Sequence, residues 1–170
     1  ILRQSNVSLS EDNGLLALIR ANIKGEAVYD DESISQDFIF KSDAGEIFDI
    51  MDCATGIKSF AILQLLIKNN YLDKSTLLII DEPEAHLHPQ WIVEYARLIV
   101  LINKVLKVKF FIASHSTDMV SAIRYISEKE GIMPDVDFYV AEENENGKYS
   151  YNYLNDDIEP IFESFNKSFD

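Results

Sequence analysis

The chain has 170 residues, of which 47% are hydrophobic and 26% are charged, and this is the size and composition of one globular domain. Its 29 acidic residues outnumber its 15 basic residues, and the formal charge of −14 argues against this chain alone wrapping nucleic acid or lying on an anionic membrane. A single cysteine excludes an internal disulfide. The polar start is unlike a signal peptide, and no apolar run nears the ~20 residues that span a bilayer, so we expect a cytoplasmic protein without a membrane partner.

Apolar periodicity and turn residues predict the elements of the first 70 residues. Residues 11–24 are expected to form a helix that is capped by Ser10. Two short strand-like runs follow at 37–41 and 46–50, with turn-forming residues between them. Residues 57–69 are strongly apolar, which predicts a buried helix.

From residue 76 onward, apolar strands alternate with amphipathic helices. The run 76–80 is continuously apolar, as in a buried parallel strand, and Pro89 suits the first turn of the helix that follows. The alternation predicts an α/β fold, a parallel sheet with flanking helices, in which ligands bind at the carboxyl ends of the strands. The later elements that we expect are a second buried strand at 109–113, a helix capped by Ser116, a third strand at 137–141, a hairpin strand at 149–154 and a helix at 158–169.

The last quarter of the chain is acidic. Residues 128–170 contain 12 acidic and 3 basic residues. No linker rich in Pro, Gly or Ser separates this part from the rest, so we expect one domain with an acidic face. Such a face suits docking of another domain or of an effector such as a nuclease.

The segment LLIIDEPEAHLHP at residues 77–89 contains the strongest chemical pattern. Four apolar residues followed by Asp81 and Glu82 match a Walker B strand. An aspartate at a strand tip can hold Mg²⁺ through water, and an adjacent glutamate can orient or deprotonate the water that attacks a γ-phosphate. A strand that simply ends in solvated acids has the same short pattern, so the neighbouring motifs decide between the two readings.

Two neighbouring motifs favour the catalytic reading. CATGIKSF at residues 53–60 is similar to the signature motif LSGGEKSL, and FIASHS at residues 111–116 resembles a switch-histidine loop. The three motifs stand in the order and at the spacing of ABC-type ATPases, in the branch of RecF, the structural-maintenance-of-chromosomes (SMC) proteins and the overcoming-lysogenization-defect nucleases. The resemblance implies a P-loop-NTPase-like fold, with the Walker B motif and D-loop at 77–89.

The resemblance also implies a role for each motif residue. Asp81 would hold Mg²⁺ through water, Glu82 would act as the general base, and His115 would sense the γ-phosphate. The signature loop would lie at the start of a helix, where free N–H groups suit a phosphate, and would contact the nucleotide of a second protomer. That loop comprises Ala54, Thr55, Gly56, Lys58 and Ser59, with Ala54 in the place of the family's serine.

The resemblance implies an ATP- and Mg²⁺-dependent enzyme that dimerises on ATP and acts in DNA repair or maintenance, or in defence against phage. The full-length protein would be the one to meet DNA. A phosphate-cradling G-x-x-x-x-G-K-[ST] loop does not occur among the six glycines. We therefore expect residues 1–170 to be the C-terminal portion of one ATPase domain, with poor ATP binding and negligible hydrolysis on their own.

Two other functions remain open from the sequence. A non-catalytic interaction domain that retains the fold is favoured by Ala54 and opposed by the intact Asp81, Glu82 and His115. The second open function is the ATPase subunit of a membrane transporter. It is ranked lower because transporter D-loops usually differ from the EAHLHP of residues 84–89.

Some residues have competing interpretations. His86 and His88 have the spacing of a zinc pair, but a D-loop role is favoured because only two ligands are evident. Cys53 is expected to be a small, half-buried residue rather than a nucleophile, and Trp91 a core residue. The tyrosines at 149, 151 and 153 are expected to pack a hairpin, because the surrounding acids disfavour stacking on bases.

Overall fold

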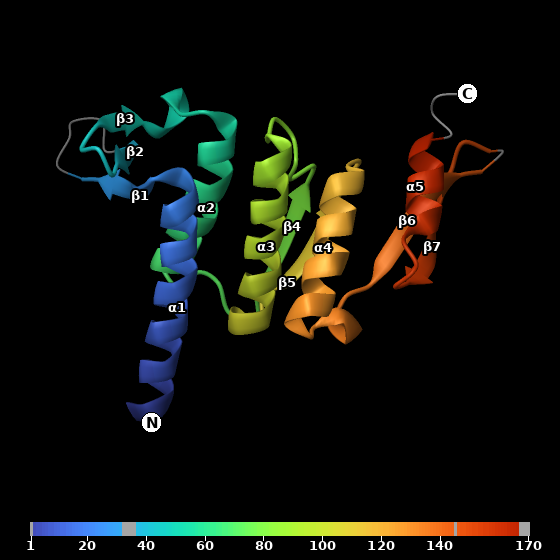
Figure 1. Ribbon diagram of the computed structural model, residues 1–170, viewed down its shortest axis with the longest axis horizontal. Coiled ribbons are helices and arrows are strands. Elements are labelled where there is room, and N and C mark those ends of the chain that lie inside the picture. Colours follow the sequence, from blue (N-terminus) through green and yellow to red (C-terminus); the bar gives the residue numbers. More distant parts are fainter. Residues whose placement is uncertain (1, 32–36, 145, 167–170) are drawn as a thin grey trace.

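The computed structural model describes residues 2–31, 37–144 and 146–166 (Figure 1). The elements are α1 (Leu2–Ile23), β1 (Gly25–Asp30), β2 (Asp37–Ser42), β3 (Ile47–Asp49), the 3-10 turn η1 (Ile50–Asp52), α2 (Thr55–Lys68), β4 (Leu77–Asp81), α3 (Pro89–Leu106), β5 (Lys109–Ala113), α4 (Thr117–Glu130), η2 (Met133–Asp135), β6 (Phe138–Glu143), β7 (Tyr149–Asn155) and α5 (Glu159–Asn166).

The amino-terminal part forms a helix and a small antiparallel sheet. Strands β1, β2 and β3 pair in that order, and β1 was not expected from the sequence. The predicted helix start was wrong, because α1 begins at Leu2 and Ser10 therefore lies inside the helix rather than at its cap. The sheet is joined to α2 by Gln64, whose buried side-chain Oε1 accepts a hydrogen bond from the N–H of Ala27 at 2.7 Å.

Strands β4 and β5 form the parallel sheet at the centre of the molecule. They pair in register from Leu77 beside Lys109 to Asp81 beside Ala113, so both strands end at the same level. Helices α3 and α4 lie together over one face of this sheet (Figure 1). The α/β architecture with a parallel sheet and flanking helices is therefore confirmed.

The other face of this sheet is uncovered within the part of the chain that the structure describes. Leu78, Ile80 and the matching side chains of β5 pack on the core, whereas Leu77, Ile79 and Phe111 are 56%, 72% and 59% exposed. The sequence predicted two buried strands, and that prediction was wrong for these residues. The continuous apolar run is typical of a strand with both faces covered, but the described helices cover only one.

The carboxyl-terminal part forms a hairpin and a helix over a second, smaller core. The predicted third strand exists as β6, but it pairs antiparallel with β7 and does not join the parallel sheet. A turn ending at Gly147, which has a φ of +70°, reverses the chain between the two strands. Val120, Phe138, Val140 and Ile161 form the small core. The last helix was expected to reach residue 169; the structure describes it over Glu159–Asn166, and residues 167–170 lie outside the described residues.

One edge of the molecule gathers the ends that carry the motifs. The carboxyl ends of β4 and β5 and the amino-terminal ends of α2, α3 and α4 all lie at the upper edge in Figure 1. Among the described helices, none has the length and apolar character needed to cross a bilayer.

Candidate functional site

Two carboxylates lie where β4 ends. Asp81 is the last residue of the strand and is exposed on the same uncovered face as Ile79. Glu82 has a φ of +46°, and its N–H donates to the carbonyl oxygen of Ala113 at 2.8 Å. A left-handed backbone is uncommon for a residue other than glycine, and here it turns the chain out of the strand while Glu82 stays bonded to β5. The side chains of Asp81 and Glu82 therefore leave the backbone in different directions.

The structure brings Glu82 and His115 together across the ends of the two strands. Glu82 Oε1 lies 3.7 Å from His115 Nε2, and the two side chains are 54% and 78% exposed. This distance is too long for a hydrogen bond but within reach of an ion pair when the histidine is protonated. The ring of Phe165, from α5, lies 6.3 Å from the ring of His115. These side chains are thus open to solvent, with a carboxylate and an imidazole side by side at the strand ends.

Glu84 connects the D-loop to the histidine loop, and sequence reasoning did not single it out. Its Oε1 accepts hydrogen bonds from the hydroxyl of Ser114 at 2.8 Å and from the N–H of His115 at 2.9 Å. The Ser114 hydroxyl in turn accepts from the N–H of Ser116 at 3.1 Å, next to the start of α4. Glu84 Oε2 is buried without a partner among the described side chains and backbone. The only sequence signal for this connection was a hydroxyl residue directly before His115.

The signature loop starts α2 without a side-chain cap. Ala54 occupies the cap position and makes no side-chain hydrogen bond there. The side chains of Lys58 and Ser59 are used within the loop, since Lys58 Nζ donates to the carbonyl oxygen of Met51 and Ser59 Oγ to that of Thr55. The loop therefore offers backbone N–H groups of the first helical turn, rather than these two side chains, to a ligand.

Gly56 is needed for packing. A Cβ at this position would lie 2.7 Å from Trp91 Cε3 and 3.1 Å from Leu87 Cδ2. The Trp91 ring packs edge-on against Phe60, with centroids 5.6 Å apart, and Trp91 is partly buried against the core, as its place on the apolar helix stripe predicted. The signature helix and the D-loop are thus in close contact through a position where only glycine fits without rearrangement.

The two histidines between the end of β4 and the start of α3, His86 and His88, have different positions in the fold. His88 caps α3, and its Nδ1 accepts a hydrogen bond from the N–H of Gln90 at 3.3 Å. His86 lies in the preceding loop with a φ of +63°. In the part of the chain that the structure describes, no three His, Cys, Asp or Glu residues are grouped to hold a metal ion. The geometry favours loop and cap roles over a zinc pair.

Cys53 is half-buried, as expected from the sequence. Its Sγ donates to the carbonyl oxygen of Asp49 at 3.5 Å, and burial raises the pKa of the thiol. A raised pKa favours the protonated thiol over the thiolate, which is the nucleophilic form. The environment therefore disfavours a nucleophilic role.

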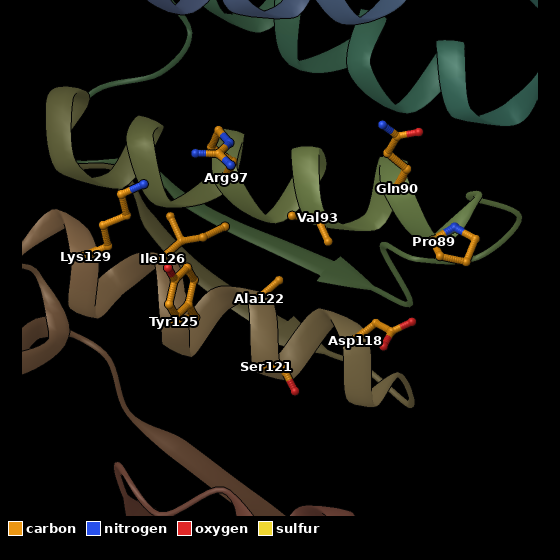
Figure 2. A pocket seen from close by; sticks show the side chains of 10 residues that line it. All are labelled: Pro89, Gln90, Val93, Arg97, Asp118, Ser121, Ala122, Tyr125, Ile126 and Lys129. Carbon is orange, nitrogen blue, oxygen red and sulfur yellow. The ribbon is translucent and has the colours of Figure 1, made fainter.

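A groove of about 520 Å³ lies between α3 and α4, on the outer side of the helix layer (Figure 2). Asp81, Glu82 and His115 are not among its lining residues. Its lining residues are Pro89, Gln90, Val93 and Arg97 of α3 and Asp118, Ser121, Ala122, Tyr125, Ile126 and Lys129 of α4.

Comparison with solved structures finds the same fold in the heads of SMC ATPases. A structure described as ATP-driven dimerization and DNA-stimulated activation of SMC ATPases matches with a TM-score of 0.58 and 13% identity, over 91% of this chain and 93% of that chain. The Smc head domain with a coiled coil and joint from Pyrococcus yayanosii matches with a TM-score of 0.64 and 14% identity, over 99% of this chain and 30% of that chain. The Pyrococcus furiosus Smc head bound to the C-terminal domain of ScpA matches with a TM-score of 0.58 and 14% identity, over 99% and 39% of the two chains.

These identities are low, so the likeness shows a shared fold, that of SMC ATPase heads. No curated protein sequence matches the chain. The family described as AAA ATPase domain matches residues 6–120, which is more than half of the chain. The resemblance to ABC-type ATPases of the SMC and RecF branch is confirmed by this family and this fold together. The chain belongs to the AAA ATPase domain family.

Proposed function

We propose that this chain contributes the Walker B, D-loop, switch-histidine and signature parts of an ATP-hydrolysing site. The observation that carries the proposal is the approach of Glu82 and His115, 3.7 Å apart at the carboxyl ends of β4 and β5. These residues are 33 positions apart in the sequence, and each follows an apolar strand. In open α/β sheets, ligands bind at this edge.

The carboxylate oxygens at the end of β4 are suitable ligands for one Mg²⁺ ion that also binds a nucleotide. Mg²⁺ keeps several waters and usually takes one or two carboxylates together with phosphate oxygens, so the exposed Asp81 carboxylate is a fitting protein ligand. Bound Mg²⁺ would neutralise charge on the phosphates. Glu82 would orient and deprotonate the attacking water. His115 would contact the γ-phosphate next to that water. Glu84 would keep the His115 backbone in place.

The phosphate-binding loop would come from a segment that packs on the uncovered face of the β4–β5 sheet. Asp81 lies on that face, so a loop holding the phosphates must approach from there to share Mg²⁺ with it. We therefore propose that the chain is the C-terminal portion of a single ATPase domain. The uncapped start of α2 would contact the nucleotide of a second protomer, in an ATP-dependent homodimer like the dimerization described for the SMC ATPases.

DNA maintenance or defence against phage is the setting that we propose for the complete protein. DNA-stimulated activation is described for SMC ATPases, and ScpA is bound to the Smc head of Pyrococcus furiosus, so a DNA substrate and a protein partner are both reasonable for a relative of this fold.

A non-catalytic interaction domain is the second candidate function. Ala54 makes no side-chain contact at the signature loop, and Lys58 and Ser59 are held within it. These features weaken the loop's hold on a nucleotide. This alternative predicts that the complete protein does not bind Mg-ATP at all.

The Glu82→Gln variant of the full-length protein tests the proposal. We expect ATP binding to persist, phosphate release to stop, and the ATP-bound dimer to accumulate, because the amide cannot accept the water proton. Calorimetry, phosphate release and light scattering measure the three quantities, and Glu128→Gln on the exposed side of α4 is the matched control. Normal turnover in Glu82→Gln would remove this residue from its role, and absent ATP binding in the unmodified protein would favour the non-catalytic alternative.

A further inference from the structure

The β6–β7 hairpin has one face covered with exposed tyrosines. Tyr139 lies beside Tyr153 in the register, with ring centroids 5.3 Å apart, and Tyr151 and Tyr149 follow along the same face of β7. The four tyrosine residues are between 54% and 71% exposed. The sequence predicted that these tyrosines pack the hairpin; they lie on it, but their outer faces are open. We call the four side chains the tyrosine face.

The opposite face of the hairpin is the one that packs. Phe138 and Val140 are buried against Ile161 of α5, and Leu154 is partly buried with them. Because side chains alternate along a strand, this packing fixes the tyrosine face outward. The tyrosines are thus carried on two paired strands that pack on α5 rather than on a loop. It also lies beyond residue 120, where the match to the AAA ATPase domain ends.

Carboxylates border the tyrosine face at both ends. The Tyr153 hydroxyl donates to Asp137 Oδ1 at 3.1 Å, and the Tyr149 hydroxyl to Glu143 Oε2 at 3.5 Å. Residues 137–157 contain six acidic residues and one lysine. The face is therefore aromatic and strongly negative.

This combination selects among possible partners. Nucleic acid is disfavoured because its phosphates would meet carboxylates. A purely apolar partner would leave those carboxylates without a counter-charge. A guanidinium group satisfies both features, since it stacks on tyrosine faces and pairs with carboxylates in a fixed fork geometry. Contiguous exposed aromatic surface of this kind marks interaction sites.

We infer that the tyrosine face binds an arginine-rich segment of a partner protein. Arginine planes lie on Tyr139, Tyr151 and Tyr153, and their N–H groups bond the bordering carboxylates Asp137 and Glu143. This binding site is separate from the strand-end residues, and it stands whether or not the proposed ATPase function holds.

A labelled decapeptide of alternating arginine and glycine is the probe, and fluorescence polarisation measures its dissociation constant for the full chain. We expect the Tyr139→Ala/Tyr151→Ala double variant to bind the peptide about tenfold more weakly, and Tyr151→Phe to bind as the unmodified chain does. Glu143→Gln is expected to weaken binding about threefold. The matched control is Tyr71→Ala, because Tyr71 is as exposed as Tyr151 but follows α2.

A second measurement needs no variant. A lysine–glycine peptide of the same length and charge should bind the unmodified chain at least threefold more weakly. Unlike a guanidinium group, an ammonium group cannot form two parallel hydrogen bonds to a carboxylate or stack flat on a tyrosine ring. Equal affinity for the two peptides would overturn the inference, as would equal loss of binding in Tyr71→Ala and the double variant. Tighter binding of a single-stranded oligonucleotide, or self-association abolished by the double variant, would also overturn it.

Discussion

Glu84 fixes the conformation of the loop that presents His115. Two donors from that loop, the Ser114 hydroxyl and the His115 N–H, meet at one oxygen of its carboxylate. Hydrogen bonds to a charged acceptor are short and contribute about 1.5–3 kcal/mol each, so the pair can hold a solvent-exposed loop in one position. In the proposed ATPase, Glu84 is therefore a positioning residue, while Glu82 and His115 would face the reacting groups.

The Glu84→Ala variant is expected to free the His115 loop. In the proposed full-length ATPase, turnover should fall about tenfold, equivalent to about 1.4 kcal/mol of barrier, with little change in ATP affinity. Glu84→Gln should retain most activity because its amide oxygen can still accept both hydrogen bonds. Phosphate-release assays at saturating ATP measure the turnover.

A double variant separates positioning from a general loss of stability. If Glu84 acts through the histidine, Glu84→Ala combined with His115→Ala should be no slower than His115→Ala alone. Losses that multiply would show that Glu84 acts independently of His115. Thermal melting of each variant checks that the fold is intact.

At the scale of elements, local periodicity was enough to place the helices and strands from α2 to α5. A stripe of apolar residues, Pro89 at a helix start and Ser116 at a cap are all signals within a few neighbouring residues, and the structure has each of them in place. Strand β1 was missed because its sequence, GEAVYD, begins with glycine and contains two acids, and its stability comes from pairing with β2 and from Gln64.

The sequence predicted the candidate site only for residues that belong to a local motif. Asp81 ends one apolar strand, and Glu82 and His115 follow the ends of two paired strands, so the parallel sheet brings all three to one edge. The role of Glu84 depends on a contact between residues 30 positions apart, and that of Gly56 on the Trp91 ring, and neither leaves a local pattern. The burial of the strands was misjudged for the same reason. An apolar run predicts that a face is covered, but it does not identify the segment that covers it.

Tyr95 in α3 makes the stability of the helix layer dependent on pH. Burial raises the pKa of its hydroxyl from the ordinary value of 10.0 to about 12, and its ring packs edge-on against Phe60 at 5.2 Å. The folded state therefore binds this proton more tightly than the unfolded state. The resulting stabilisation is fully present below pH 10 and is lost between about pH 10 and pH 12, and two pKa units correspond to about 2.7 kcal/mol.

The Tyr95→Phe variant should remove this contribution to alkaline unfolding. We expect its stability at pH 7 to stay close to that of the unmodified chain, because the edge-on ring contact remains. Between pH 10 and pH 12 the variant should lose less stability, as measured by urea unfolding across that range. Tyr125→Phe is the matched control, since Tyr125 is exposed on α4. Parallel loss of stability in the Tyr95 variant and the unmodified chain would show that other groups govern alkaline unfolding.

At the scale of the whole molecule, chemistry and incomplete packing meet on one side of the sheet. Ile79 and Phe111 are more exposed than apolar strand residues usually are, and the Asp81 carboxylate lies at the end of the same face. Covering this face would complete the sheet and bring a further segment to the carboxylate in one step. Assembly of the proposed ATPase site and burial of the sheet would then be a single event. The tyrosine face, on the separate hairpin, would remain free for a partner.

The Ile79→Lys variant tests that coupling. In this chain alone, the substitution should change the free energy of unfolding by less than about 0.5 kcal/mol, because the side chain is 72% exposed. In the full-length ATPase it should weaken ATP binding at least tenfold, since a lysine would have to be buried beneath the segment that carries the phosphate-binding loop. Calorimetry measures ATP binding, and Ile62→Lys, at a 58% exposed position of α2, is the matched control. If both variants bind ATP as the unmodified protein does, the face remains open in the proposed ATPase and the phosphate-binding loop must reach Asp81 from elsewhere.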